Sequence, residues 1–328
     1  MSQTLQAKVK KDALTYWTKR GFPYPEKNDE DFGKEYLRLS KTSITAIIGE
    51  DNIVRINPVG LRIVNFFHPQ IWKIRVKDAY SPMDRFNDPV ALKKIIEKSV
   101  RIWPNRKVFN STYLRNAIRI HSKTRAVTNF RPAVAKTIIE KYSNDGDSVL
   151  DFCAGFGGRL LGCLTLKRHY YGVDPSSEQI TGNNAILEYC RDSFEVNCRV
   201  DLKKDTAETH LAGLLDQSFS LVFSSPPYFD YERYSTEETQ SHIKFSKYST
   251  WKDGFLRKVI EESYRLLKPE GYFVIHVKNL KGYPIEDDLR AIANDIFRLE
   301  QTLYLQTVSR PYRANTKKYE PILVFKKI

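Results

Sequence analysis

The residues whose types are best suited to binding or catalysis follow a short apolar run, in the segment LVFSSPPYFDYERY (221–234). Two serines, two prolines and a tyrosine succeed one another where that run ends. Proline removes a ladder donor and is rarely found inside a strand, so we expect a strand to end here. The loop that follows combines a rigid backbone, poor in hydrogen-bond donors, with a flat aromatic ring. This combination indicates that the loop holds a ligand.

A second candidate lies about seventy residues earlier, in SVLDFCAGFGGRLLG (148–162). This pattern predicts a strand, a glycine-rich turn and the start of a helix. Gly155, Gly157 and Gly158 permit positive φ and let the backbone approach a ligand closely. Asp174 ends the next predicted strand, where an acid can accept hydrogen bonds from ribose hydroxyls. The two features together indicate a nucleoside site.

The turn differs from the loops that bind phosphate. It is not a dinucleotide GxGxxG, because Asp151 precedes it within DFCAGFGG, and it lacks the Gly-Lys-Ser/Thr of a P-loop. An acid at a strand end repels phosphate and suits a ligand that carries positive charge. S-adenosylmethionine has ribose hydroxyls, an α-ammonium group and a sulfonium, and it is the cofactor that we expect.

The two motifs together resemble those of the class I S-adenosylmethionine-dependent methyltransferases, and among them the DNA amino-methyltransferases of the N4-cytosine/N6-adenine type. VLDFCAGFGG resembles their cofactor motif, and SSPPY resembles their Ser/Asn/Asp-Pro-Pro-aromatic catalytic motif. TNFRP (128–132) resembles the segment that closes over the methionine end of the cofactor. The match of order and spacing extends over about 128–328. It implies a Rossmann-like α/β fold with a mainly parallel sheet and an antiparallel edge strand.

The resemblance implies catalytic roles for four consecutive residues. The hydroxyl oxygen of Ser225 and the carbonyl oxygen of Pro226 would accept the two hydrogens of an exocyclic amine, with Pro227 fixing the backbone. Tyr228 would stack on the base. The amine lone pair would then point at the methyl donor, and in-line transfer would rest on orientation and electrostatics. The base would have to flip out of a duplex to reach this pocket.

The resemblance also implies a cofactor-binding set. Asp151 and the turn backbone would face the methionine part, Asp174 would hold the ribose, and Arg131 would pair with the methionine carboxylate. For the adenine, Asp205 and Glu208 remain alternatives, and Phe156 packs either on the adenine or on the sheet. The full set comprises Arg131, Asp151, Ala154, Gly155, Phe156, Gly157, Asp174, Asp205 and Glu208.

Helices and strands must alternate to bring these motifs to one edge of a sheet. From residue 126 onward the apolar periodicity predicts such an alternation, which indicates a mainly parallel sheet covered on both faces. The last two strands have only a short basic connection, RPYRANTKKY, so we expect them to pair antiparallel at one edge. The predicted strands lie at 148–155, 170–176, within 218–227, and at 271–279, 301–309 and 320–328.

The remaining residues predict a separate basic domain at 1–125, ahead of a catalytic domain at 126–328. A hairpin is predicted at 52–67, with its turn at Pro58-Val59-Gly60. Two helices are predicted, at 88–103 with Asp88 as N-cap and at 111–125. The polar loop at 229–251 is expected to frame the substrate pocket.

Charge points to a polyanionic partner. The chain has 53 Lys and Arg against 39 Asp and Glu, a net charge of +14, and residues 1–147 hold +13 of it. So basic a segment favours nucleic acid as that partner. The resemblance to DNA amino-methyltransferases implies that this nucleic acid is double-stranded DNA. Phosphate-contacting candidates on the second basic helix are Arg115, Arg119, Lys123 and Arg125.

Composition narrows the remaining classes. Apolar residues make up 41 % of the chain, enough for a core. No apolar run approaches the roughly 20 residues of a membrane span, and the N-terminus lacks the apolar core of a signal peptide. The four cysteines show neither CxxC pairing nor histidines at zinc spacing. We therefore expect free thiols, no metal site and a cytoplasmic protein.

The target base follows only from the resemblance, which associates a serine before the prolines with cytosine N4 and an Asn or Asp with adenine N6. Cytosine N4 of DNA is thus the expected target. Adenine N6 of DNA, a base in RNA, and an inactive nucleic-acid-binding module on the same fold remain alternatives. The residues specify neither a recognition sequence nor a restriction partner.

Overall fold

The computed structural model describes residues 3–102, 109–122, 124–307 and 318–328. The chain forms two compact units, and it passes between them more than once. The smaller unit comprises Met1–Lys27, Pro69–Thr128 and Tyr231–Ser235, and the larger comprises Asn28–His68, Asn129–Asp230 and Thr236–Ile328.

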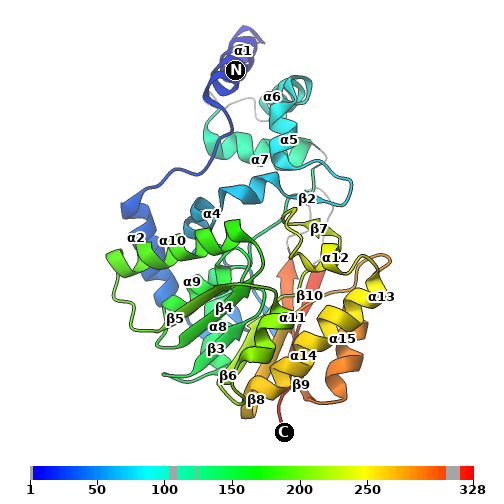
Figure 1. Ribbon diagram of the computed structural model, residues 1–328. Helices are drawn as coiled ribbons and strands as arrows, with labels where there is room; N and C mark the ends of the chain where they lie inside the picture. Colours follow the sequence, from blue (N-terminus) through cyan, green and yellow to red (C-terminus); the bar gives the residue numbers. More distant parts are fainter. Residues whose placement is uncertain (1–2, 103–108, 123, 308–317) are drawn as a thin grey trace. The chain divides into compact units, whose positions relative to one another are not determined.

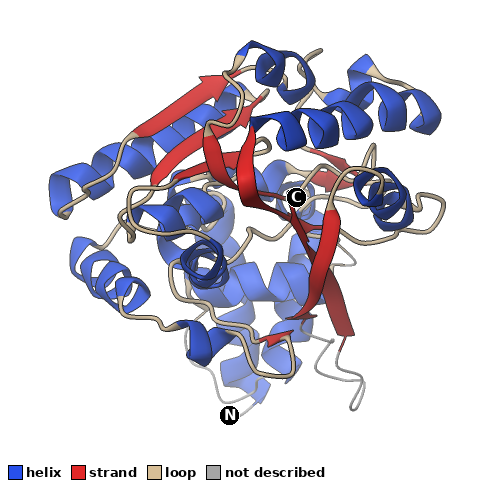
Figure 2. Ribbon diagram, turned by 90° about the horizontal axis from the view of Figure 1, so that it is seen from below, coloured by secondary structure: helices blue, strands red, loops and turns tan. Residues whose placement is uncertain are grey.

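An eight-stranded sheet forms the centre of the larger unit (Figures 1 and 2). Its order is β1-β9-β10-β8-β6-β3-β4-β5. Strand β10 runs antiparallel to both of its neighbours, and the other pairs are parallel, as predicted. The strands are β1 (Ile53–Val54), β3 (Ser148–Asp151), β4 (His169–Asp174), β5 (Val200–Lys204), β6 (Phe219–Ser224), β8 (Leu267–His276), β9 (Arg298–Thr307) and β10 (Lys318–Lys326).

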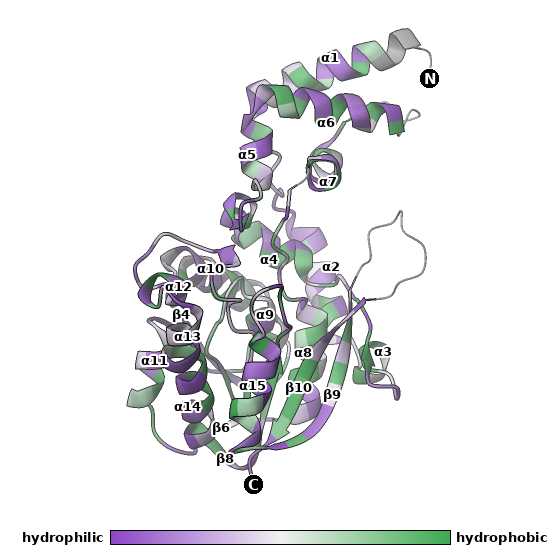
Figure 3. Cartoon of the chain, turned by 90° about the vertical axis from the view of Figure 1, so that its right-hand side faces the viewer, coloured by the Kyte–Doolittle hydropathy of each residue, from purple (hydrophilic) through white to green (hydrophobic). Residues whose placement is uncertain are grey.

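Helices cover both faces of this sheet, which explains the buried apolar runs within its central strands. In β6, Leu221, Val222 and Phe223 are all buried, and Figure 3 shows green stretches in the sheet and mixed purple and green along the helices. One layer contains α2 (Asp29–Ser40), α3 (Ile44–Ile47), α4 (Leu61–Phe67), α8 (Pro132–Tyr142), α9 (Gly158–Leu164) and α10 (Ser177–Ser193). The other contains α11 (Ala207–His210), α13 (Tyr248–Trp251), the π-helical stretch Lys252–Arg257, α14 (Lys258–Leu266) and α15 (Ile285–Asn294).

Residues 28–68 pack into the larger unit, although the sequence had placed them in the basic N-terminal domain. The hydroxyl of Tyr36 donates to the carbonyl oxygen of Leu164 at 2.9 Å, and its ring stacks on Phe194 with centroids 3.9 Å apart. Strand β1 pairs with β9 and forms the edge of the sheet. The expected single boundary at residue 125 therefore differs from the observed division, in which residues 28–68 belong to the larger unit.

The hairpin predicted at 52–67 is wrong. This segment contains the two-residue strand β1 and then helix α4, whose N-cap is Gly60 at φ 91°. A Cβ at Gly60 would lie 2.6 Å from Cβ of Pro132, so the close contact with α8 requires glycine there. Ile63 and Val64 are fully buried, as neighbours on the inner face of a helix are, and the short apolar run does not distinguish that helix from a strand.

In the eight-stranded sheet, the sequence analysis missed strand β5. In β5, Val200 and Leu202 alternate with Asp201 and Lys203, and none of these four side chains is fully buried. Because β5 is an edge strand that pairs only with β4, it needs little apolar surface. Because β5 is polar, the apolar pattern of the sequence did not predict this strand.

The smaller unit is mainly helical. Its core includes Trp17, Ile96 and Leu114. Asp88 caps the helix that begins at Pro89 by accepting hydrogen bonds from the backbone N–H groups of Val90 and Ala91. The helices are α1 (Gln3–Arg20), a 3₁₀ turn at Pro69–Lys73, α5 (Pro82–Asn87), α6 (Pro89–Ile102) and α7 (Ser111–His121), and the strands are β2 (Arg75–Val76) and β7 (Glu232–Arg233). Lys123, one of the predicted phosphate contacts, lies outside the described residues, as does most of the basic connection RPYRANTKKY.

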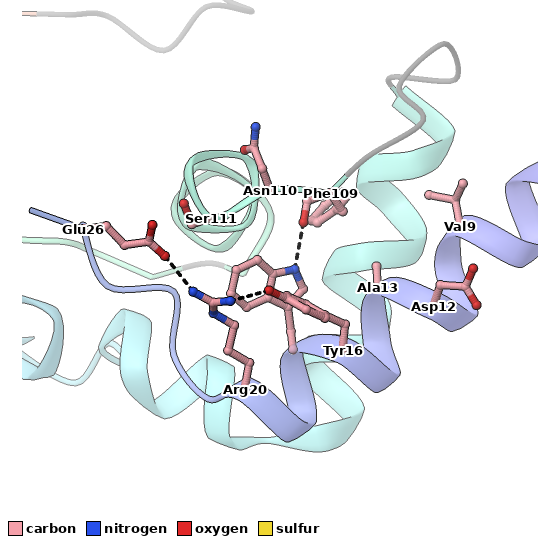
Figure 4. A pocket seen from close by; sticks show the side chains of 10 residues that line it. Val9, Asp12, Ala13, Tyr16, Arg20, Glu26, Phe109, Asn110 and Ser111 are labelled. Carbon is pink, nitrogen blue, oxygen red and sulfur yellow. Dashed lines mark hydrogen bonds and ion pairs between the residues drawn. The ribbon is translucent and has the colours of Figure 1, made fainter. Parts of the chain in front are cut away.

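A pocket of about 540 Å³ lies beside α1 in the smaller unit (Figure 4). The guanidinium group of Arg20 bonds the carboxylate of Glu26 at 2.7 Å and the hydroxyl of Tyr16 at 2.5 Å. The indole N–H of Trp17 donates to the carbonyl oxygen of Phe109 at 2.8 Å. The Trp17 contact ties α1 to the segment that precedes α7, and the Arg20 contacts tie the end of α1 to the residues that follow it.

All of the net charge lies in the smaller unit. Its residues include 21 Lys and Arg against 7 Asp and Glu, a net of +14. The larger unit has 32 of each and is neutral overall. The two units of the fold therefore differ more in net charge than do the two parts of the sequence on either side of residue 147. Among the described residues, no helix is long and apolar enough to cross a membrane.

Candidate active site

The glycine-rich turn joins β3 to α9 at the carboxyl edge of the sheet. Gly155 (φ 55°) and Gly157 (φ 72°) adopt the left-handed conformation that glycine accepts without steric cost. A Cβ at Gly157 would lie 2.5 Å from Oδ1 of Asn183, whereas one at Gly155 would meet only the carbonyl oxygen of Cys153, at 3.7 Å. The backbone at Gly155 is therefore open to a ligand.

Two buried asparagines, which the sequence analysis did not single out as site residues, hold this turn. Nδ2 of Asn129 donates to the carbonyl oxygen of Phe156 at 2.9 Å, and Nδ2 of Asn183 donates to that of Gly155 at 3.1 Å. His68 lies 3.0 Å from Oδ1 of Asn183, and burial lowers the pKa of this histidine to about 4 although the hydrogen bond raises it. Asn129 belongs to TNFRP, so that segment positions the turn.

Asp174 ends β4 beside the turn. Its carboxylate accepts from the backbone N–H of Gly155 at 2.8 Å and from that of Ser176 at 3.0 Å. Burial raises the pKa of Asp174 to about 6, against the opposing effect of these hydrogen bonds. The carboxylate is thus oriented by the turn and still has lone pairs for a ligand hydroxyl.

Asp151 is fully buried and surrounded by internal donors. It accepts from Nε of Arg159 at 2.7 Å, from the hydroxyl of Tyr170 at 2.7 Å and from that of Ser224 at 2.8 Å. Its carboxylate therefore links β3 to α9, β4 and β6. In this arrangement it braces the base of the turn.

The two acids considered for the adenine have partners of their own. Asp205, just past β5, accepts from the backbone N–H of Thr206 and lies 2.9 Å from Nδ1 of His210. Glu208 is buried and forms an ion pair with Lys244 at 2.8 Å. The side chain of Asp205 is 45 % exposed and that of Glu208 only 5 %, so Asp205 is the more accessible of the two.

The SSPPY segment begins at the end of β6, next to the glycine-rich turn. Strands β3 and β6 are paired, and Oγ of Ser224 accepts from the backbone N–H of Cys153 at 3.1 Å. Ser225 lies just past the end of β6, and its hydroxyl group contacts the neighbouring strand β8 instead of the turn. Its hydroxyl donates to the carbonyl oxygen of His276 at 3.0 Å.

The aromatic residue of the motif is largely covered. Tyr228 is 8 % exposed, and Nζ of Lys278 lies 5.6 Å from its ring centroid. Phe229 follows at φ 54°, a left-handed conformation that costs a non-glycine residue of order 1–3 kcal/mol. Its ring packs against Tyr248 and Tyr283, which hold it in place. Strained backbone of this kind is concentrated at functional sites.

A charged cluster beside Ser225 was missed by the sequence analysis. Nε2 of His276 lies 3.1 Å from Oε2 of Glu320, whose other oxygen lies 2.5 Å from Nζ of Lys278. Burial alone would raise the pKa of Glu320, but the hydrogen bonds and charges of His276 and Lys278 outweigh it and lower that pKa to about 2. Arg131 lies near the same carboxylate, whose charge partly offsets the lowering of the Arg131 pKa by burial.

The loop after the motif lies along the ends of β4 and β5. The carboxylate of Glu237 accepts from the backbone N–H of Ser177 at 3.1 Å, and the hydroxyl of Thr239 donates to the carbonyl oxygen of Pro175 at 3.3 Å. Together with the Lys244–Glu208 pair, these contacts place residues 237–244 next to Asp174. Helix α12 (Ser241–Lys244) lies within this stretch.

Comparison with solved structures finds several methyltransferases. TrmN from Thermus thermophilus is 14 % identical over 60 % of this chain and 49 % of its own, about half its length, with a TM-score of 0.41. A SAM-dependent O-methyltransferase from Thermotoga maritima is 11 % identical over 62 % and 67 %, with a TM-score of 0.42. A SAM-dependent methyltransferase from Methanosarcina mazei is 18 % identical over 58 % and 97 %, with a TM-score of 0.38. No curated protein matches the sequence.

The family comparison covers most of the chain. Residues 5–185 and 219–328 match the model of the N6 and N4 methyltransferase family, described as DNA methylase. The match includes the glycine-rich turn, Asp174 and SSPPY, whereas Asp205 and Glu208 lie in the interval that it omits. The resemblance stated from the motifs is thereby confirmed. The chain belongs to the N6/N4 family of DNA methylases, amino-methyltransferases whose cofactor is S-adenosylmethionine.

Proposed function

We propose that this protein methylates the exocyclic amine of a base in double-stranded DNA and that its target is cytosine N4. The observation that carries the proposal is the contact between the two loops. Ser224 bonds the backbone of the glycine-rich turn, so Ser225, the next residue, begins the catalytic motif one strand away from Gly155. A methyl donor on the turn and an acceptor at Ser225 would then be neighbours.

The residues at the turn fit S-adenosylmethionine. This cofactor supplies an electrophilic methyl group on a positively charged sulfur. Asp174 offers a carboxylate for ribose hydroxyls, the open backbone of Gly155 admits the methionine part, and Asp205 is the more accessible acid for the adenine amine. We assign Ala154, Phe156 and Gly157 to the wall of this site. Asp151 supports it from below, and Arg131 would meet the methionine carboxylate.

The SSPPY residues would orient the acceptor amine. The hydroxyl proton of Ser225 already points to the carbonyl oxygen of His276, which leaves the oxygen lone pairs of Ser225 free for an amine hydrogen. Pro226 would offer its carbonyl oxygen as the second acceptor, with Pro227 fixing the backbone. Two acceptors hold the amine so that its nitrogen lone pair points at the methyl carbon, and orientation then provides most of the rate. Tyr228 would have to move its ring to stack on the base.

The smaller unit would supply affinity for DNA. Its net charge of +14 suits a phosphate backbone, and Lys94, Lys98 and Arg101 are exposed on one side of α6. Arg115 and Arg119 are further candidates, and Arg125 also lies near the hydroxyl of Tyr231, at 3.3 Å. The target base would leave the duplex to enter the pocket. The four free cysteines favour a cytoplasmic location.

Incubation with S-adenosylmethionine labelled in its methyl group tests this proposal. Duplex DNA, single-stranded DNA and RNA of matched sequence should be offered in parallel, with bound cofactor measured separately. We expect label in duplex DNA, a lower yield in single strands, and none in RNA. Label in RNA alone would contradict the proposed substrate. Cofactor binding without transfer to any polymer would favour an inactive binding module.

A further inference from the structure

Three polar side chains form a row across neighbouring strands at the carboxyl edge of the sheet. In the pairing of β6 with β8, Ser224 lies opposite Ile275, so Ser225 and His276 are the next residues along. In the pairing of β8 with β10, His276 lies opposite Ile322, two residues from Glu320. Strand register, rather than sequence proximity, therefore brings Ser225, His276 and Glu320 together.

The contacts within this row are directional. The hydroxyl group of Ser225 lies 3.0 Å from the carbonyl oxygen of His276 and 3.4 Å from its Nδ1. Nε2 of the same ring lies 3.1 Å from Oε2 of Glu320. An Nε2–H that donates to the carboxylate leaves Nδ1 as an acceptor that faces Ser225.

The carboxylate at the end of the row is ionised. Lys278, on the segment that follows β8, bonds the other oxygen of Glu320, and Arg131 from the start of α8 adds a second positive charge nearby. The ring of Phe130 lies edge-on to His276 at 5.5 Å, and the His276 residue is only 9 % exposed. These are the charged and aromatic neighbours of the histidine from the elements around it. They leave Glu320 as the counter-charge that an imidazolium would need.

We propose that His276, held by Glu320, takes up through Ser225 the proton that the amine loses during methyl transfer. The inference rests on the proposed function. His276 acts through another residue and is thus a positioning residue. The backbone carbonyl and the imidazole of His276 have different roles. The carbonyl oxygen accepts the hydrogen bond from the Ser225 hydroxyl before the reaction. Only the imidazole is basic enough to receive a proton.

The proton and electron pairs balance in this scheme. Methyl transfer would form a bond between the amine nitrogen and the methyl carbon, while the carbon–sulfur bond of the donor would break with its electron pair left on sulfur. The nitrogen then gives one of its hydrogens as a proton to Oγ of Ser225, and Ser225 gives its own to Nδ1 of His276. The imidazolium, stabilised by the carboxylate of Glu320, releases the proton to solvent after the product leaves.

Three variants test the relay: His276→Asn, which keeps a polar side chain without a basic nitrogen, Glu320→Gln, and the matched control Glu270→Gln. Glu270 lies on β8, far along the strand from the site, and pairs with Lys326. The pH dependence of kcat should be recorded with duplex DNA, together with KM and cofactor affinity. For the wild type we expect kcat to fall at acidic pH, where an imidazolium cannot accept the proton.

For His276→Asn we expect kcat to fall about 10- to 100-fold, with KM and cofactor affinity unchanged and the acidic decline abolished. Glu320→Gln should move that decline to lower pH, because the imidazolium loses its counter-charge, and Glu270→Gln should match the wild type. A His276→Asn enzyme with wild-type kcat, or one that is slower but keeps the acidic decline, would overturn the relay alone. Wild-type protein that methylates no DNA would overturn the proposed function and the relay with it.

Discussion

Ser224 and Ser225 are consecutive residues whose hydroxyl groups point to opposite sides of β6. Oγ of Ser224 lies 2.8 Å from the buried carboxylate of Asp151, and the hydroxyl of Ser225 donates to the carbonyl oxygen of His276 at 3.0 Å. The first serine ties β6 to the glycine-rich turn. The second is the residue at which we propose that an acceptor amine binds. The sequence repeats one residue type, but β6 lies between β3 and β8, and the two side chains contact different neighbours.

Replacing each serine in turn should separate these functions. Ser225→Ala should lower kcat about 100- to 1,000-fold, because an acceptor for the amine is lost, with cofactor affinity unchanged. Ser224→Ala should instead lower the free energy of unfolding by about 1–3 kcal/mol, because it removes a buried donor to Asp151. Steady-state kinetics, calorimetric cofactor titration and chemical denaturation measure the three quantities. Equal loss of cofactor binding and turnover in Ser225→Ala would contradict the role given to that residue.

Cofactor affinity should depend on the ionisation of Asp174. The pKa of this carboxyl group is about 6, so its carboxylate is lost as pH falls through that value. We expect affinity for S-adenosylmethionine to fall up to tenfold for each pH unit below 6. Asp174→Asn should bind the cofactor weakly and without this pH dependence. Isothermal titration between pH 5 and 8 checks the prediction, and a wild-type affinity that is flat across that range would refute it.

The same group should affect stability in the opposite direction. Because the folded-state pKa of Asp174 lies above the roughly 4 of an unfolded carboxyl group, the folded protein holds this proton more tightly. Its contribution to the free energy of unfolding is present below about pH 4 and is lost as pH rises through about 6. Asp174→Asn should therefore gain stability relative to the wild type as pH rises from 4 to 7. Denaturation at several pH values measures the difference, and a constant difference would be inconsistent with the burial of this charge.

Two glycine substitutions should change stability with opposite signs. Gly157→Ala places a Cβ 2.5 Å from Asn183 at φ 72°, and we expect a loss of about 2–4 kcal/mol together with weakened cofactor binding. Gly33 lies inside α2 with open space around its Cβ position, so Gly33→Ala should gain about 0.5–1 kcal/mol. Thermal and chemical denaturation distinguish the outcomes. Wild-type stability in Gly157→Ala would show that the turn is looser than its contacts indicate.

Charge on α6 should govern affinity for DNA. Replacing Lys94, Lys98 and Arg101 with alanine should weaken binding to all duplex sequences alike and lower the salt slope of the binding constant by about three. A control triple in the larger unit, with alanine at the exposed residues Lys41, Lys167 and Lys258, should leave both quantities nearly unchanged. Fluorescence anisotropy at several salt concentrations provides the slopes. Equal effects of the two triples would indicate that net charge, and not this face, determines binding.

Much of the larger unit was predictable because its signals are local. The alternation of apolar strands and amphipathic helices predicted the parallel sheet, and the short link between β9 and β10 predicted their antiparallel pairing. Proline and glycine in the two motifs predicted that a loop follows each of β6 and β3, although β3 ends at Asp151 and the strand predicted there extended to Gly155. Strand β5 was not predicted, because an edge strand needs few apolar residues. Helix α4 was mistaken for a hairpin because short apolar runs fit both elements.

The parts that the sequence did not reveal depend on contacts between distant residues. His276 and Glu320 lie 44 positions apart, and only the register of β8 with β10 brings them together. Asn129, in the segment before α8, and Asn183, in α10, hold the glycine-rich turn from two separate parts of the chain. Tyr36 docks its segment onto α9 and α10, so that residues 28–68 belong to the larger unit. No periodicity in a single stretch encodes such pairings.

Nucleoside mass spectrometry of methylated duplex DNA tests the central claim most directly. Wild-type protein and Ser225→Ala should be incubated with S-adenosylmethionine and the same duplex, and the DNA then digested to nucleosides. We predict N4-methylcytosine in the wild-type reaction and at least a hundredfold less with the variant. N6-methyladenine in its place would change the target base and keep the mechanism. Methylation at a carbon atom, or wild-type yields from Ser225→Ala, would contradict the account.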